Sequence, residues 1–294
     1  MPKWHVYVNR AAGRKAYEPA LIRDLLRELH LDFELQVPDS PEETRGLLED
    51  AARSGATHFA MAGGDGTVNV AVNALMPLGL VAPPVIGVLP VGTGCDLLRT
   101  FGLPQDVAGA ARHLTGDDTY DIDVGTLEGT WGLRYFVNVA QTGVGAAAAQ
   151  TATSLGRRLG AARYPLAFMA RLPGFPRAKV KITTERRTIE SEALAVILAN
   201  AQFFAGGWNV APKAMLVDGA LDVQIINCRK TYAPALVPKV IKGTHLSDPA
   251  VRRLSAAEFT IETDPPWPIE CDGDLVGNTA VRGRVIPAAI SLKI

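Results

Sequence analysis

The stretch THFAMAGGDGTVNVAVNALM, residues 57–76, decides the fold because it places a glycine-rich turn between an apolar strand and a helix. Its three glycines let the backbone approach a ligand closely, and a helix N-terminus after such a turn favours phosphate. Asp65 would repel phosphate unless a cation mediates, and Mg²⁺ is the natural mediator. The alternative is a tight turn capped by Thr67. We favour a nucleotide-phosphate site.

A second glycine turn, LPVGTGCD at residues 89–96, follows the next predicted strand at 85–88. It again places glycines, a hydroxyl and a carboxylate at the carboxyl end of a strand, where open α/β sheets bind their ligands. Two consecutive turns of this kind, each with an aspartate, indicate one shared site.

In the first 100 residues, short apolar runs typical of strands alternate with segments whose apolar residues have helical spacing. We predict strands at 5–9, 33–37, 57–62 and 85–88, and helices at 17–29, from Ser40, at 68–76 and near 95–101. Ser40 begins its helix as N-cap, with Pro41 at the first helical position and Glu43 completing a capping box. Residues 1–118 are therefore expected to form an α/β nucleotide-binding domain with a parallel sheet.

After about residue 118 the pattern becomes mostly β. We predict strands at 120–127, 135–140, 179–184, 190–199, 221–226 and 258–263, with one helical segment at 146–171 that breaks at Pro165. Residues 119–294 should then form a sandwich-like second domain, whose last strand packs back towards the first.

Composition limits the function classes. The 294 residues carry no net charge, yet residues 1–130 hold 10 Lys/Arg against 18 Asp/Glu and residues 131–294 hold 20 against 12. The longest apolar run, residues 193–199, is too short to span a bilayer. No signal peptide is evident at the start, and three scattered cysteines suggest a reducing compartment. We expect a cytoplasmic protein.

The densest basic stretch, residues 157–187, contains nine Lys/Arg and one acid. Tyr164, Phe168, Leu172 and Phe175 are interleaved with it. One interpretation is a peripheral surface that meets anionic lipid; the others are solvated charges and core packing of the aromatic residues. We expect no nucleic-acid partner.

Other motifs give weaker signals. No P-loop occurs, and the G-x-G-x-x-A pattern at 143–148 lacks the acid that a dinucleotide site needs about 20 residues later. Asp-Gly pairs at 218–219 and 272–273 are typical of β-turns. Acids on both sides of Gly273 could also supply a general base.

The order of these motifs resembles the diacylglycerol kinase catalytic family, which includes bacterial lipid kinases, sphingosine kinases and ceramide kinases. The matching elements span nearly the whole chain: Asn9 with Gly13, GGDGT at 63–67, GTGCD at 92–96, FVNVAQTGVGA at 136–146, FFAGGWNVAPKAMLVDGALDV at 203–223 and DGD at 272–274. GGDGT alone is shared with NAD kinases and phosphofructokinases, whereas the later motifs are specific to the lipid kinases.

The resemblance implies an ATP- and Mg²⁺-dependent kinase that phosphorylates a lipid hydroxyl, such as that of diacylglycerol or a related lipid alcohol. It implies these nucleotide-binding residues: Asn9, Ser40, Gly63, Gly64, Asp65, Gly66, Thr67, Gly92 and Thr93. Asp65 would reach the phosphates through Mg²⁺. Asp96 and Asp123 resemble acids that organise the interdomain cleft. Met215 and Ala220, through their carbonyls, and Asp218, through its carboxylate, resemble a second Mg²⁺ site.

Two departures concern the chemistry. Cys95 stands where the family has an asparagine, and a thiol is a poor substitute for an amide. Asp274 stands where the family has its catalytic glutamate, so the base is one methylene shorter; Asp272 is the alternative base. A soluble-substrate kinase of the NAD kinase type and a catalytically weak nucleotide- or lipid-binding relative stay open as alternatives. The sequence leaves a homodimer open as well.

Overall fold

The computed structural model describes residues 2–12, 18–91, 95–155, 159 and 162–294. The chain forms two compact units, Met1–Val124 with Pro287–Ile294, and Gly125–Ile286. The chain passes from one unit to the other within two strands, β5 (Thr119–Gly129) and β16 (Val281–Lys293). The sequence predicts the boundary at residue 118.

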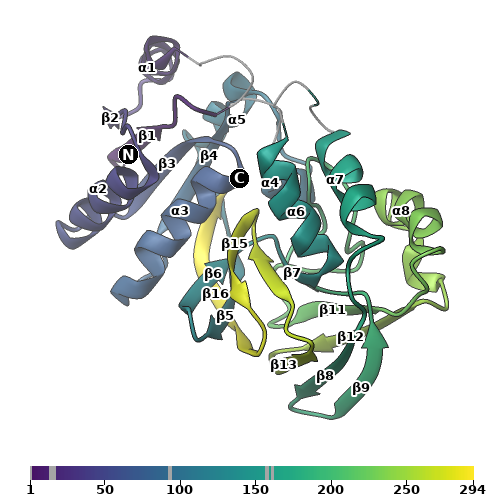
Figure 1. The fold of residues 1–294 in the computed structure, drawn as a ribbon. Helices are drawn as coiled ribbons and strands as arrows, with labels where there is room; N and C mark the ends of the chain where they lie inside the picture. Colours follow the sequence, from purple (N-terminus) through teal and green to yellow (C-terminus); the bar gives the residue numbers. More distant parts are fainter. Residues whose placement is uncertain (1, 13–17, 92–94, 156–158, 160–161) are drawn as a thin grey trace. The chain divides into compact units, whose positions relative to one another are not determined.

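Unit 1 is an α/β unit in which strands and helices alternate (Figure 1). Its elements are β1 (Trp4–Val8), α1 (Pro19–Glu28), β2 (Phe33–Gln36), α2 (Pro41–Arg53), β3 (His58–Gly63), α3 (Asp65–Leu75), η1 (Met76–Leu78), β4 (Val85–Pro90), α4 (Asp96–Thr100), α5 (Val107–His113), the first part of β5 (Thr119–Gly129) and the end of β16 (Val281–Lys293).

The sheet of unit 1 is parallel, in the order β2-β1-β3-β4-β16. Its strands are short apolar runs whose side chains are buried, as parallel strands between helices require. The core includes Trp4, Ile22, Leu26, Ala60 and Leu89, each fully buried or nearly so. The carboxyl ends of β3 and β4 are neighbours in this sheet, and the first glycine turn follows β3. Residues 92–94 of the second glycine turn lie outside the described residues.

Unit 2 is mostly β. Its elements are the end of β5, β6 (Gly132–Phe136), β7 (Val139–Gly143), α6 (Val144–Ser154), α7 (Arg163–Arg171), β8 (Ala178–Thr184), β9 (Thr188–Ala193), β10 (Ala195–Ala199), β11 (Leu221–Ile226), α8 (Ala233–Lys242), η3 (His245–Ser247), β12 (Val251–Ala256), β13 (Glu258–Asp264), β14 (Pro268–Cys271), β15 (Asp274–Asn278) and the start of β16.

One antiparallel sheet of unit 2 has the order β12-β11-β10-β7-β14-β15. The other strands include the antiparallel set β16-β13-β8-β9 and the hairpin β5-β6. Fully buried Phe136 and Trp267 belong to the core of this unit. The fold class predicted from the sequence, an α/β unit with a β sandwich-like one, is confirmed.

Three predicted elements of unit 2 are wrong in detail. Residues 135–140 are not one strand, because β6 ends at Phe136 and β7 begins at Val139. Residues 190–199 are likewise divided at Leu194, whose backbone N–H donates to the carbonyl of Ile226. Pro165 does not break a long helix; it lies in the first turn of α7, where a proline costs no hydrogen bond.

Among the described residues, no helix combines the length and apolar character that crossing a bilayer requires.

Candidate functional site

The glycine turn of unit 1 has little room for side chains at its first position. A Cβ on Gly63 would lie 2.0 Å from Oγ1 of Thr67, so only glycine fits there. Gly64 is the N-cap of α3, and its carbonyl accepts hydrogen bonds from the N–H groups of Thr67 and Val68. Helix α3 therefore begins at Asp65, three residues earlier than the sequence predicts.

Asn9 and Thr67, which were both predicted to bind the nucleotide, contact each other beside this turn. Nδ2 of Asn9 donates to Oγ1 of Thr67 at 3.0 Å. The Asn9 side-chain oxygen accepts from the N–H of Ala11 at 2.9 Å, so the amide is fixed at both ends. This contact joins the end of β1 to the start of α3.

The Asp65 carboxylate is held against the start of α4. Oδ2 accepts from the N–H of Asp96 at 2.9 Å, and Oδ1 accepts from the N–H of Leu97 at 3.1 Å and from the Cys95 thiol at 3.2 Å. A carboxylate at a helix N-terminus is stabilised by the helix dipole and by N–H groups that lack partners within the helix. Burial raises the pKa of Cys95 well above its ordinary value, so the thiol stays protonated and able to donate.

The side chains of three further residues predicted in unit 1 make contacts of their own within that unit. Oγ of Ser40 accepts from the N–H of Glu43 at 3.1 Å, so it caps α2 as predicted. Asp96 is buried and pairs with Arg99 at 3.4 Å, and Asp123 is buried and accepts from the N–H of Ala288 at 2.9 Å. Gly92 and Thr93 lie outside the described residues.

In unit 2, Asp272 and Gly273 form the two-residue turn of the hairpin β14-β15. Both residues have positive φ, 47° and 99°, as the hairpin turn favoured by Asp-Gly requires. The Asp272 carboxylate accepts hydrogen bonds of 2.8–3.0 Å from three consecutive N–H groups, those of residues 137–139. Asp272 therefore fixes the connection between β6 and β7 to the hairpin turn.

Asp274, the first residue of β15, lies opposite Cys271 across the hairpin and is exposed. Among the described residues, no hydrogen bond or ion pair engages its side chain. The two acids of the DGD motif thus differ in what they can do. Asp272 is held by backbone donors, whereas Asp274 is open to a proton donor from outside.

The structure adds an acid that the sequence analysis missed. Glu270 is fully buried on β14. Its Oε2 accepts from Nε2 of Gln141 at 2.7 Å, and its Oε1 accepts from the N–H of Gly273. Burial raises the pKa of Glu270 to about 8. The available signal was a lone acid in the apolar run before the DGD motif.

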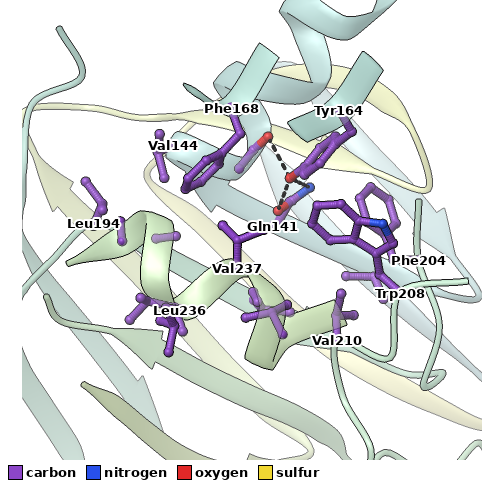
Figure 2. Close-up of a pocket in the computed structure, with 17 residues that line it drawn as sticks. Gln141, Val144, Tyr164, Phe168, Leu194, Phe204, Trp208, Val210, Leu236 and Val237 are labelled. Atoms are coloured by element: carbon purple, nitrogen blue, oxygen red, sulfur yellow. Dashed lines mark hydrogen bonds between the residues drawn. The ribbon is translucent and has the colours of Figure 1, made fainter. Parts of the chain in front are cut away.

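A partly open cavity lies within unit 2. Figure 2 shows Phe168, Phe204 and Trp208 on its walls, with Leu236 and Val237 from α8. The polar side chains on the lining are those of Gln141 and Tyr164, which lie together and are hydrogen-bonded (Figure 2). The cavity has the apolar lining of a small-molecule or lipid-chain site.

The hydrophobic residues interleaved with the basic stretch divide between the core and this cavity. Leu172 and Phe175 are buried in the core of unit 2, as the core-packing interpretation expects, so these two do not belong to an exposed surface. Tyr164 and Phe168 line the cavity. Helix α7, which carries Tyr164 and Phe168, also has exposed apolar side chains at Leu166 and Met169.

The residues predicted for a second Mg²⁺ site lie in one loop before β11. Asp218 is exposed, and its Oδ1 accepts from the N–H of Ala220 at 3.1 Å; Met215 is also exposed. One carboxylate with two backbone carbonyls is an oxygen donor set of the type that Mg²⁺ accepts. The described residues contain no cluster of three His, Cys, Asp or Glu suited to a metal ion.

Comparisons with known proteins agree with this division of the chain. The family model described as the diacylglycerol kinase catalytic domain matches residues 3–127. The model described as the YegS C-terminal NAD kinase beta sandwich-like domain matches residues 138–294.

Several relatives match along almost the whole chain. A diacylglycerol kinase of Mycobacterium tuberculosis (strain H37Rv) is 30% identical over 290 residues, which cover 97% of this chain and 91% of the relative. A Shewanella frigidimarina protein named "Probable lipid kinase YegS-like" is 27% identical, covering 99% and 94%. The crystal structure of a diacylglycerol kinase from Bacillus anthracis has the same fold, with a TM-score of 0.74 at 20% identity over 99% of this chain and 96% of that one. The chain therefore belongs to the lipid kinase family that combines a diacylglycerol kinase catalytic domain with a YegS-type C-terminal domain, and it is a phosphotransferase.

Proposed function

We propose that the chain transfers the γ-phosphoryl group of ATP to the hydroxyl of a lipid, with diacylglycerol or a related lipid alcohol as the acceptor. The observation that carries the proposal is the apolar cavity of unit 2. Each methylene of an acyl chain that enters it is worth about 0.8 kcal/mol of transfer free energy. A soluble acceptor such as NAD has no alkyl chain to fill walls made of Phe168, Trp208 and Leu236.

Asp274 is the general base in this proposal. It takes the proton of the acceptor hydroxyl while the hydroxyl oxygen bonds to the γ-phosphorus and the bond from that phosphorus to the bridging oxygen of ADP breaks. Protein kinases use an aspartate in the same role, so the shorter side chain is chemically adequate. In this proposal Asp272 holds the turn in place and is not the base, because its carboxylate already accepts three backbone hydrogen bonds.

Unit 1 supplies the nucleotide site. The turn at 63–67 offers backbone N–H groups and the N-terminus of α3 to phosphate, and Asn9 fixes Thr67 beside it. Mg²⁺ would be held with Asp65, whose carboxylate is oriented by the start of α4. When bound, Mg²⁺ neutralises phosphate charge. Asp218, with the carbonyls of Met215 and Ala220, would hold a second ion that stiffens the loop before β11.

Helix α7 supplies the contact with an anionic membrane in this proposal. Leu166 and Met169 are about half exposed, at 50% and 48%. Arg171 ends the same helix and is exposed. Apolar side chains that enter the interface and a cation that meets anionic headgroups together give reversible binding.

Labelled ATP tests the proposal directly. The protein is incubated with labelled ATP and Mg²⁺, with diacylglycerol, a sphingoid base or phosphatidylglycerol in mixed micelles, and with NAD in a parallel reaction. We expect the label in a lipid product. Label in NAD with none in lipid, or no transfer at all, would overturn the proposal.

A further inference from the structure

A continuous set of hydrogen bonds runs from the wall of the unit 2 cavity to the turn that bears Asp274. Gln141 lines the cavity, and its Nε2 lies 3.3 Å from the Tyr164 hydroxyl and 2.7 Å from Oε2 of Glu270. The Tyr164 hydroxyl also donates to the carbonyl of Gly145, another lining residue, at 3.2 Å. The cavity wall is thus connected to a fully buried carboxyl group.

The second carboxyl oxygen of Glu270 contacts the turn of the hairpin β14-β15. Oε1 accepts the N–H of Gly273, the residue immediately before Asp274. The β14-β15 register shifts between Ile269 and Glu270, and a shift of this kind re-aims the side chain at that position. Glu270 therefore holds the turn from inside, while Asp272 holds it through residues 137–139.

We propose that Glu270 is a positioning residue that transmits occupancy of the cavity, through Gln141, to the turn that carries Asp274. A lipid chain beside Gln141 and Tyr164 restricts the Gln141 amide, the amide fixes Glu270, and Glu270 fixes Gly273. Asp274 reaches its working position when the cavity is filled. The inference rests on the proposed lipid kinase function, and it names a control of that reaction by the acceptor's own chain.

The electrostatic surroundings make Glu270 sensitive to its contacts. Burial is the main cause that raises the pKa of Glu270, and the charges of Asp272 and Asp274 of the hairpin raise it further. Tyr164 from α7, Gln141 from β7 and the adjacent Cys271 are uncharged near neutral pH, since burial raises the pKa of Tyr164 and of Cys271. Because no cation bonds to its carboxyl group among the described residues, Glu270 depends on its Gln141 and Gly273 hydrogen bonds.

Glu270→Gln tests the inference, because a glutamine keeps the shape and its one oxygen can still accept the Gly273 N–H. Its amide nitrogen then faces the Gln141 Nε2 donor and cannot accept from it, so the contact from the cavity is broken, and the side chain cannot ionise. Labelled-ATP transfer is measured with dioctanoylglycerol and dioleoylglycerol in mixed micelles, from pH 6 to 9. In the wild type we expect a higher kcat for the longer chain. In Glu270→Gln we expect kcat for dioleoylglycerol to fall about 10- to 100-fold, the range for misplacement of a reacting group near 1 Å, with KM nearly unchanged. The difference in kcat between the two lipids should disappear, as should the change in kcat near pH 8.

Two further variants keep the test decisive. Gln141→Leu interrupts the same contacts from the cavity side and should reproduce the loss of kcat, even if Glu270→Gln fails to fold. Asp248→Asn removes a different buried acid of unit 2, one bonded to Lys239 and Tyr232, and should leave the chain-length and pH dependence of kcat unchanged.

The outcomes separate this inference from the proposed function. A wild type that phosphorylates no lipid overturns both. A wild type that is active on lipid, together with a folded Glu270→Gln or Gln141→Leu whose kcat, chain-length dependence and pH profile match it, overturns the inference alone. Loss of the chain-length dependence in both variants, but not in Asp248→Asn, supports it.

Discussion

The glycine turn of unit 1 and the hairpin turn of unit 2 both carry an aspartate, and both aspartates bond to backbone N–H groups. Asp65 holds the start of α4, and Asp272 holds residues 137–139. The hairpin differs in carrying a second acid, Asp274, which is exposed. The comparison indicates that a carboxylate within a glycine turn can hold neighbouring backbone groups in place. In the proposed mechanism, the general base is the acid whose carboxylate oxygens are available to a substrate.

The largest effect should come from the exposed acid. Asp274→Asn removes the base and should lower kcat about 10²- to 10⁴-fold, the usual contribution of general base catalysis. Because the side chain is exposed, the midpoint of urea unfolding should not move. Transfer of labelled phosphate to diacylglycerol measures the first quantity. A variant with near wild-type kcat would show that the base lies elsewhere.

Asp272, which holds the hairpin turn in place, should affect stability rather than the chemical step. Asp272→Asn leaves three N–H groups facing an amide that has one acceptor oxygen. The free energy of unfolding should fall by about 3–5 kcal/mol, because hydrogen bonds to a charged group are worth about 1.5–3 kcal/mol each and are only partly lost. Urea unfolding measures this. A loss of kcat without a loss of stability would contradict the assigned role.

Glu270 should make stability depend on pH. Its pKa is about 8 in the folded chain against an ordinary value of 4.5, so the folded state binds the extra proton between these values. Stability is therefore greatest below about pH 4.5 as far as this group is concerned, and it falls as pH rises to about 8. Glu270→Gln should be more stable than the wild type at pH 9, by about 1–3 kcal/mol. Unfolding midpoints of the two proteins at pH 6 and pH 9 test the sign, which would be contradicted if their difference stayed constant.

The role of the cavity of unit 2 can be tested with a large side chain on α8. Val237→Trp places a large side chain at the lining from α8 and should raise KM for dioleoylglycerol about tenfold, which corresponds to about 1.4 kcal/mol. Ala235→Trp, at an exposed position of the same helix, is the matched control. Equal KM values for the two variants would argue against a lipid chain in the cavity.

The smallest effect should come from unit 1. Cys95→Ala removes the thiol that donates to Asp65 but keeps the two backbone donors, so the free energy of unfolding should fall by about 1 kcal/mol. Urea unfolding again provides the measurement. A loss as large as that of Asp272→Asn would mean that the two turns depend on their side-chain contacts equally.

The sequence predicted unit 1 better than unit 2 for a physical reason. Buried parallel strands such as β3 and β4 are continuous apolar runs, and a local periodicity is enough to find them. In unit 2, the break at residues 137–138 depends on Asp272, which lies far along the chain. Helix α8 contains Pro234 and Pro238, which obscure its helical pattern.

The same limit applies to the site. Glycine turns and Asp-Gly pairs are recognisable in the sequence, and they predict Asp65, Asp272 and Asp274 as site residues. Which of the two carboxylates, Asp272 or Asp274, is held by hydrogen bonds depends on the backbone groups that lie near each of them. A local sequence pattern therefore does not predict the different roles of the two acids. Glu270 was missed because a lone acid in an apolar run does not by itself show whether its side chain is buried.

Chemical rescue tests the role of Asp274 most directly. Single-turnover transfer from labelled ATP to diacylglycerol is measured for the wild type and Asp274→Ala, with and without added formate. The account predicts a slow Asp274→Ala whose rate rises with formate concentration, while the rate of the wild type does not. An Asp274→Ala that transfers phosphate at the wild-type rate without formate would contradict it.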